Sequence, residues 1–143
     1  MPIDPNYFPF AELEGYQETS PEDPSYNCIG WAAGDSKNWW DPYFRDGYWP
    51  NGVPRAWSVA ALIALFQTLG YTQCTNGVLE QGYEKVALYW DGFLIKHAAK
   101  QLSNGSWVSK LGPSVDIEHN STRAVEGPAY GTVIVFLRRQ IPP

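Results

Sequence analysis

The C-terminal half of the chain constrains the fold most, because short strand-like segments there alternate with tight-turn signals. Residues 84–90 (EKVALYW) and 93–102 (FLIKHAAKQL) are separated by an Asp-Gly pair, which is typical of a two-residue β-hairpin turn. A Ser-Asn-Gly turn then precedes a third strand-like segment at 106–112, and residues 130–139 are rich in β-branched side chains. The pattern predicts an antiparallel meander with one strand that returns late in the chain.

Two segments before the meander are expected to be helical. Residues 27–34 (NCIGWAAG) begin with asparagine, a good N-cap, and end with glycine, so they predict one short helix. Residues 57–69 are apolar on nearly all sides and lie between Pro54 and Gly70, which predicts a buried helix. Residues 113–127 fit either a short helix or a loop that crosses the end of the sheet. Helices followed by an antiparallel meander indicate the α+β class.

The length of 143 residues fits a single domain over residues 1–143. Residues 1–26 contain five of the twelve prolines and little periodicity, so we expect them to form an irregular N-terminal arm. This segment lacks the basic and apolar regions of a secretory signal, and the apolar run in WSVAALIALF is too short to span a membrane. A cytoplasmic location is therefore expected.

The charge and the motif content exclude several classes of function. The net charge is −5, and the longest basic run is Arg138-Arg139, so we expect neither a nucleic-acid partner nor a membrane surface. The chain has no glycine-rich phosphate loop and no G-x-S-x-G motif. No cofactor is expected, and a protein partner remains compatible with the composition.

Cys28 is the candidate nucleophile. A thiol in the first turn of a helix lies near unpaired backbone N–H groups and the positive end of the helix dipole, and both lower its pKa. Asn27 and the Cys28 backbone would then stabilise an oxyanion. Alternatively, Cys28 is a small buried apolar residue, as free cysteines often are. A disulfide with Cys74 is a third reading, which a reducing cytoplasm disfavours.

His97 is the preferred general base. Strand alternation places His97 on one face with Ile95, and this is the core face because the neighbouring lysines point outward. An imidazole there would approach a helix that packs on the sheet, and a Cys–His pair would result if that helix starts at Cys28. Ser109 is expected close to His97 on the next strand but is a poor group to orient an imidazole.

Two further residues complete the candidate catalytic set. Asp116 would orient His97 and stabilise an imidazolium, while His119 is either an alternative orienting group or the base itself. A metal site built from Cys28, His97 and His119 has no support from local ligand spacing, so no metal is expected.

Residues 35–55 form a long aromatic segment between the two expected helices, which we call the aromatic loop. Loops of this length inside a compact domain are often functional. One reading makes the loop a substrate-binding wall beside Cys28, and the other makes it a cover over the core. The candidate binding residues are Asn27, Trp39, Trp40, Tyr48 and Trp49.

The chain resembles an uncharacterised bacterial domain family over residues 26–139. The motifs are N-C-I-x-W-A at 27–32, H-A-A-[KR]-Q-L at 97–102 and W-x-S-K-L-G at 107–112. More loosely, the chain is similar to papain-like cysteine peptidases and amidases of the NlpC/P60 group, through KVALYWDGFLIKHA. In that group the catalytic histidine usually precedes this segment, where Glu84 and Lys85 stand here.

The looser resemblance implies a papain-like architecture, with N-terminal helices packed on an antiparallel sheet. It favours a cysteine-dependent acyl-transfer enzyme of the peptidase, amidase or deamidase type. The substrate would be a peptide, a protein or a small amide-containing molecule. The alternative is a non-catalytic, small acidic binding protein, such as an immunity protein, an inhibitor or an accessory factor, that acts through the aromatic loop.

Overall fold

The computed structural model of the protein describes residues 3–20, 23–44, 46–111 and 115–142. Residues 1–2 and 21–22 of the expected arm, residue 45 of the aromatic loop, residue 112 at the end of the expected third strand and residues 113–114 lie outside this part. The helices are α1 (Ala11–Glu14), α2 (Cys28–Ala32), α3 (Val59–Thr68) and the 3-10 helix η1 (Thr122–Val125). The strands are β1 (Tyr16–Ser20), β2 (Thr72–Cys74), β3 (Tyr83–Trp90), β4 (Ile95–Gln101), β5 (Trp107–Lys110), β6 (Asp116–His119) and β7 (Thr132–Gln140).

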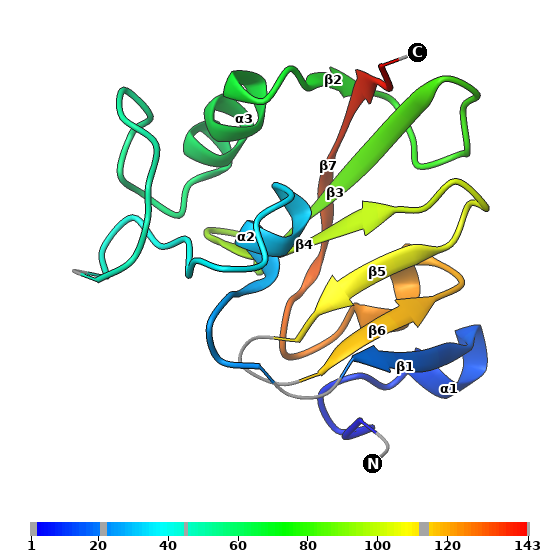
Figure 1. Ribbon diagram of the computed structural model, residues 1–143. Coiled ribbons are helices and arrows are strands. Elements are labelled where there is room, and N and C mark those ends of the chain that lie inside the picture. The colour runs from blue at the N-terminus through cyan, green and yellow to red at the C-terminus, as the bar shows by residue number, and fades with distance from the viewer. Residues whose placement is uncertain (1–2, 21–22, 45, 112–114, 143) are drawn as a thin grey trace.

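One seven-stranded sheet organises the molecule, in the order β1-β6-β5-β4-β3-β7-β2. The strand pairs are antiparallel; β3, β4 and β5 form the expected meander, and β6, which the sequence analysis does not predict, extends it. The late strand β7 returns along the whole of β3, from Tyr83↔Gln140 to Trp90↔Thr132. The strands fan from β1 to β7, which shows the normal twist of a sheet (Figure 1). The two chain ends lie at opposite ends of this twisted sheet (Figure 1).

The expected α+β architecture, with papain-like N-terminal helices packed on a sheet, is wrong. The described residues form a mainly antiparallel sheet, and α1 and α2 have only four and five residues. The expected irregular arm contains α1 and the edge strand β1. The described part of residues 113–127, for which the sequence allows a short helix or a loop, contains β6 and the 3-10 helix η1. These two strands pair with each other, from Tyr16↔His119 to Ser20↔Asp116. Each acquires strand structure from a partner about 100 residues away, so local periodicity does not reveal it.

Local capping explains where the two central helices begin. The Asn27 side chain accepts a hydrogen bond from the Gly30 amide at 3.1 Å, and α2 starts at the next residue. In the same way, the Ser58 hydroxyl accepts from the Ala61 amide at 3.1 Å at the start of α3. Both helices carry buried apolar residues that pack against the sheet.

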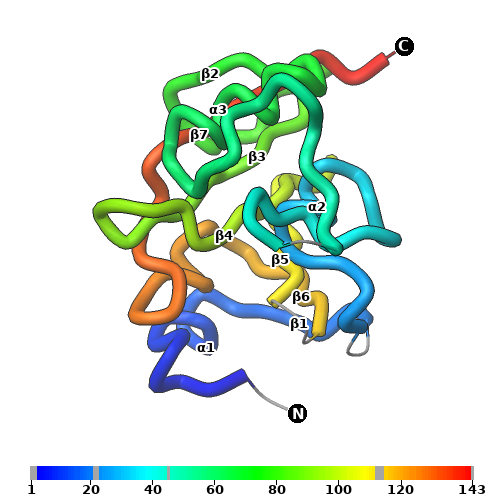
Figure 2. Tube along the Cα trace, turned by 90° about the vertical axis from the view of Figure 1, so that its left-hand side faces the viewer, coloured from blue at the N-terminus to red at the C-terminus, as the bar shows by residue number. Residues whose placement is uncertain are grey.

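The sheet buries a separate apolar cluster on each face. On one side, which we call the helix-covered face, α2 and α3 pack on Val86, Leu88 and Ala98. On the other side, which we call the opposite face, Ala87, Ala99 and Trp107 form a second cluster. Figure 2 shows α2 on one side of the sheet and the 120–131 connection, in orange, on the other. The position of a side chain on one or the other face therefore decides which groups it can reach.

Candidate functional site

A cavity of about 280 Å³ lies where the start of α2 meets the aromatic loop and the β3–β4 turn. Three aromatic side chains line it, Trp39, Trp57 and Tyr130, and we call it the aromatic cavity. The remaining lining residues are Asn27, Cys28, Asp41, Leu94, Ile95 and Lys96. Thus Asn27, Cys28 and Trp39, all expected site residues, meet at one place.

The aromatic loop is fastened to α2 through buried hydrogen bonds. Asn27 Oδ1 accepts from the Trp40 amide at 3.1 Å, and Asn27 Nδ2 donates to the Trp40 carbonyl at 2.7 Å. Trp40 and Trp49 are buried in the helix-covered cluster, so they stabilise the loop and offer no surface to a ligand. Tyr48 is 46% exposed and lies against Trp40, with ring centroids 4.7 Å apart.

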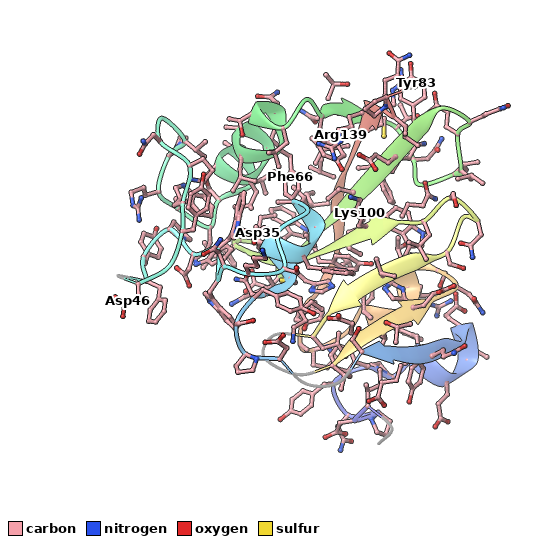
Figure 3. The ribbon with its side chains drawn as sticks, viewed as in Figure 1. Asp35, Asp46, Phe66, Tyr83, Lys100 and Arg139 are labelled. Atoms are coloured by element: carbon pink, nitrogen blue, oxygen red, sulfur yellow. The ribbon has the colours of Figure 1, made fainter. Side chains whose placement is uncertain are left out.

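Other aromatic side chains of this region are exposed to solvent. Tyr43 and Phe44 are 66% and 51% exposed, and they follow closely after the lining residue Asp41. Phe93, at the β3–β4 turn next to the lining residue Leu94, is 84% exposed. Figure 3 shows that the loop extends away from the sheet as far as Asp46. Exposed apolar groups around a cavity are typical of a binding surface.

Cys28 is buried, and burial raises its pKa to about 11 because a thiolate is poorly solvated there. Backbone hydrogen bonds and the charge of Lys110 act in the opposite direction but with smaller effect. The thiol is therefore protonated at neutral pH. The sequence analysis expects a lowered pKa for a cysteine at the start of a helix, but the pKa of Cys28 is raised. The loss of hydration of the thiolate has a larger effect than the favourable backbone N–H groups.

His97 lies on the opposite face, away from α2. It pairs with Tyr89, a member of the opposite-face cluster, and directly opposed residues of an antiparallel pair share a face. The next pair is Trp90↔Ile95, so a β-bulge at Lys96 interrupts the alternation, and Ile95 lies on the helix-covered face. The expectation that His97 and Ile95 share a face is therefore wrong. Within the described residues, Cys28 makes no hydrogen bond to either imidazole.

The two histidines are joined through Ser109 in a buried chain of hydrogen bonds. His97 Nε2 and His119 Nε2 each lie 2.8 Å from Ser109 Oγ, and His119 Nδ1 lies 2.7 Å from the Ser121 carbonyl oxygen. A carbonyl only accepts, so His119 Nδ1 carries the proton, and its Nε2 accepts from the Ser109 hydroxyl. Ser109 Oγ then accepts from His97 Nε2. This assignment leaves the lone pair of His97 Nδ1 buried, without a partner among the described residues.

Burial keeps both imidazoles neutral. It lowers the pKa of His97 well below its usual value and lowers that of His119 to about 4. Among the described residues, Asp116 makes no hydrogen bond to either imidazole, and its Oδ2 accepts from the Tyr26 hydroxyl at 2.7 Å. The expected orienting role of Asp116 thus has no counterpart in these contacts, and Ser109 takes the position beside His97.

Sequence reasoning did not single out Tyr130 or Trp57 as site residues. Trp57 precedes α3 and is partly buried, and the sequence analysis includes it only as the first residue of the expected apolar helix. Tyr130 stacks on His97 and also lines the aromatic cavity. Its only local signal is the glycine that follows, which marks a close approach of backbones: a Cβ at Gly131 would lie 1.8 Å from the Trp90 carbonyl oxygen.

Two further observations concern membranes and metals. The described ranges contain no helix with the length and apolar character needed to cross a bilayer. In the same part of the chain, no three His, Cys, Asp or Glu side chains are grouped so as to hold a metal ion. Cys28 and Cys74 are free thiols.

These observations define a small antiparallel-sheet domain with an aromatic cavity beside a buried, protonated thiol. A family model described as "Domain of unknown function (DUF7689)" matches residues 17–138, and the chain belongs to this family. No curated protein and no solved structure matches the chain.

Proposed function

We propose that the protein is a non-catalytic binding domain whose aromatic cavity receives a large apolar side chain from a partner protein. The observation that carries this proposal is the combination of a lined cavity and an exposed apolar rim. Trp39, Trp57 and Tyr130 line the cavity, and two exposed apolar side chains belong to its rim: Leu94 in the lining, 45% exposed, and Phe93 next to it in the chain, 84% exposed. Aromatic residues around a small pocket are typical of interface hot spots.

The size of the cavity indicates what it holds. Its volume of about 280 Å³ is at the lower end of small-molecule pockets, so it suits one side chain better than a large cofactor. The net charge of −5 favours a partner surface with basic residues, because complementary charge speeds encounter and excludes acidic partners. A reducing compartment such as the cytoplasm suits this function, since both thiols are free.

A displayed library of random peptides tests the proposal. Peptides selected on the unaltered protein should share a large apolar residue flanked by basic ones, and their binding should shift the indole signals of Trp39 and Trp57 in NMR spectra. Leu94→Asp places a charge on the cavity wall and should reduce binding at least tenfold. Leu13→Asp is the matched control, because Leu13 lies on α1 and is 76% exposed. No selected peptides, or binding that Leu94→Asp leaves unchanged, would contradict the proposal.

A second candidate is the cysteine-dependent acyl-transfer enzyme, and one observation favours it. Cys28 lines the same cavity that would bind a substrate, next to Asn27. A reaction there would need a base other than His97, because this imidazole lies on the opposite face of the sheet, stacked against Tyr130. Substrate binding would also have to lower the pKa of the thiol from about 11. The protonated, buried thiol makes this candidate the weaker of the two.

A further inference from the structure

The lining of the aromatic cavity includes two charged residues, Asp41 from the aromatic loop and Lys96 from the start of β4. Lys96 Nζ lies 3.7 Å from Asp91 Oδ2, so its charge is already balanced. Asp41 forms no salt bridge within the part of the chain that the structure describes. Arg55, a cation of the same loop, donates instead to the Pro42 carbonyl at 2.9 Å. The wall of the cavity therefore carries a negative charge that these residues do not neutralise.

The Asp41 carboxylate is held in place through one of its two oxygens. Its Oδ1 accepts from the amides of Tyr43 at 2.8 Å and Phe44 at 3.1 Å, which closes a local turn. The residue is only half-buried, and Oδ2 is accessible to solvent, with no hydrogen-bond partner among the described residues. A fixed carboxylate with one free oxygen can accept a charge-assisted hydrogen bond from a bound cation and still keep its structural role.

The acidic and apolar parts of the cavity wall belong to different segments. Leu94 lies in the β3–β4 turn beside the exposed Phe93, whereas Asp41 lies in the aromatic loop. An extended partner segment advances about 3.3 Å per residue, so residues one or two positions from the anchoring side chain lie over the rim of the cavity. Such a segment meets an apolar surface from one element and a carboxylate from another.

We propose that Asp41 binds a lysine or arginine that lies within about two residues of the apolar anchor in the partner protein. The inference rests on the proposed function and assigns the preference for basic partners to one residue. The apolar stem of a long basic side chain can pack along the rim while its charged end donates to Asp41 Oδ2. An acidic residue at the same position would meet a like charge, so the carboxylate also selects against acidic partner segments.

Two synthetic peptides test this contact, acetyl-GSRFRSG-amide and acetyl-GSQFQSG-amide. They share a phenylalanine anchor and differ only in the charge of its neighbours, and the symmetric order makes the result independent of chain direction. NMR titration measures both affinities through the indole signals of Trp39 and Trp57. The arginine peptide should bind the unaltered protein about fivefold more tightly, as a partly exposed ion pair allows, and about 1 M salt should remove most of this preference.

Asp41→Asn should lower the preference for the arginine peptide at least threefold. The new side chain keeps the Oδ1 acceptor for the Tyr43 and Phe44 amides, so the local turn is retained. Asp46→Asn is the matched control, because it removes the same charge from an exposed residue at the far end of the loop, outside the cavity lining (Figure 3). This control should leave the preference nearly unchanged. In the unaltered protein, the carboxyl-carbon signal of Asp41 should shift with the arginine peptide and not with the glutamine peptide.

Three results would overturn the inference and leave the proposed function standing. They are a preference that Asp41→Asn does not change, equal losses in Asp41→Asn and Asp46→Asn, and an Asp41 carboxyl signal that the arginine peptide does not shift. In each of these cases the glutamine peptide would still bind, and Leu94→Asp would still weaken its binding. If neither peptide shifts the Trp39 and Trp57 signals at millimolar concentration, both proposals fail.

Discussion

The ring of Tyr130 stacks on the imidazole of His97, with centroids 4.0 Å apart and an interplanar angle of 5°. Tyr130 also lines the aromatic cavity together with Cys28. An aromatic ring, and not a thiol, therefore lies against the candidate base. This stacking packs the connection before β7 against the middle of the sheet. Cys28 and His97 do not form the hydrogen bond that a catalytic Cys–His pair needs.

The position of Tyr130 should depend on the glycine that follows it. We expect Gly131→Ala to lower the free energy of unfolding by about 3 kcal/mol or more, because the new Cβ would lie 1.8 Å from the Trp90 carbonyl oxygen at a φ of +74°. Urea unfolding measures the change. Gly52→Ala is the control: φ there is +83°, but nothing lies within 4 Å of a Cβ, so backbone strain alone should cost about 1–2 kcal/mol. Equal losses in the two variants would contradict the close approach at Gly131.

Stability should fall as the pH decreases from 7.5 to 5. Burial lowers the pKa of both imidazoles in the folded state, to about 4 for His119, while the unfolded chain keeps values near ~6.5. The unfolded state therefore binds more protons below that pH, so His119 should lose about 2 kcal/mol of stabilisation by pH 5, and the lowered pKa of His97 acts in the same direction. Urea unfolding at several pH values measures this slope.

A variant of one histidine tests the cause of this pH dependence of stability, because the chain contains only two histidines. His119→Asn retains a donor for the Ser121 carbonyl but does not titrate, so the contribution of His119, about 2 kcal/mol between pH 7.5 and 5, should disappear from the pH dependence. An unchanged slope in this variant would show that the imidazoles are not the groups that titrate.

Alkylation with iodoacetamide should distinguish the two thiols. Cys74 is half-exposed, whereas Cys28 is buried and its pKa is raised to about 11. We expect Cys28 to react about a hundredfold more slowly than Cys74 at pH 7.5, because only the thiolate reacts and burial limits access. Mass spectrometry after digestion measures both rates. Faster reaction at Cys28 would favour the acyl-transfer candidate over the binding domain.

The Asn27 side chain should be important for both α2 and the aromatic loop. It caps the helix through the Gly30 amide and makes two bonds to the Trp40 backbone. Asn27→Ala should lower the free energy of unfolding by about 2–3 kcal/mol, through loss of the cap and of buried hydrogen bonds. Chemical denaturation measures this, with the exposed turn residue Asn51 as control, where Asn51→Ala should change stability by less than about 0.5 kcal/mol. A change at Asn27 as small as the control would contradict the shared role.

Signals within a few residues of each other predicted much of the chain correctly. The Asp-Gly pair lies in the β3–β4 turn, although this turn spans residues 91–94 and not two residues, and Asn27 precedes α2, which begins at Cys28. The β-branched run at 130–139 forms most of β7. Caps, turns and strand propensity act through neighbouring residues, so they are visible without any knowledge of the fold.

Longer-range pairing changed the candidate site. Alternation predicted that His97 would face the helices, but the β-bulge at Lys96 moves it to the other side of the sheet. The sequence places Ser109 near His97 but gives no sign that its hydroxyl hydrogen-bonds to both imidazoles. A β-bulge and a side-chain hydrogen-bond network both depend on the partner strand. The alternation of apolar and polar residues in one strand carries no information about that partner.

The amino-acid sequence by itself determined the hairpins, the caps of the short helices and the acidic, aromatic-rich composition. Only the tertiary structure decided the pairing of β1 with β6, the face that His97 occupies, the protonated state of Cys28 and the location of the aromatic cavity. The physical reason is range: propensity and capping act over a few residues, whereas pairing, burial and loss of hydration depend on groups that the fold brings together from distant parts of the chain.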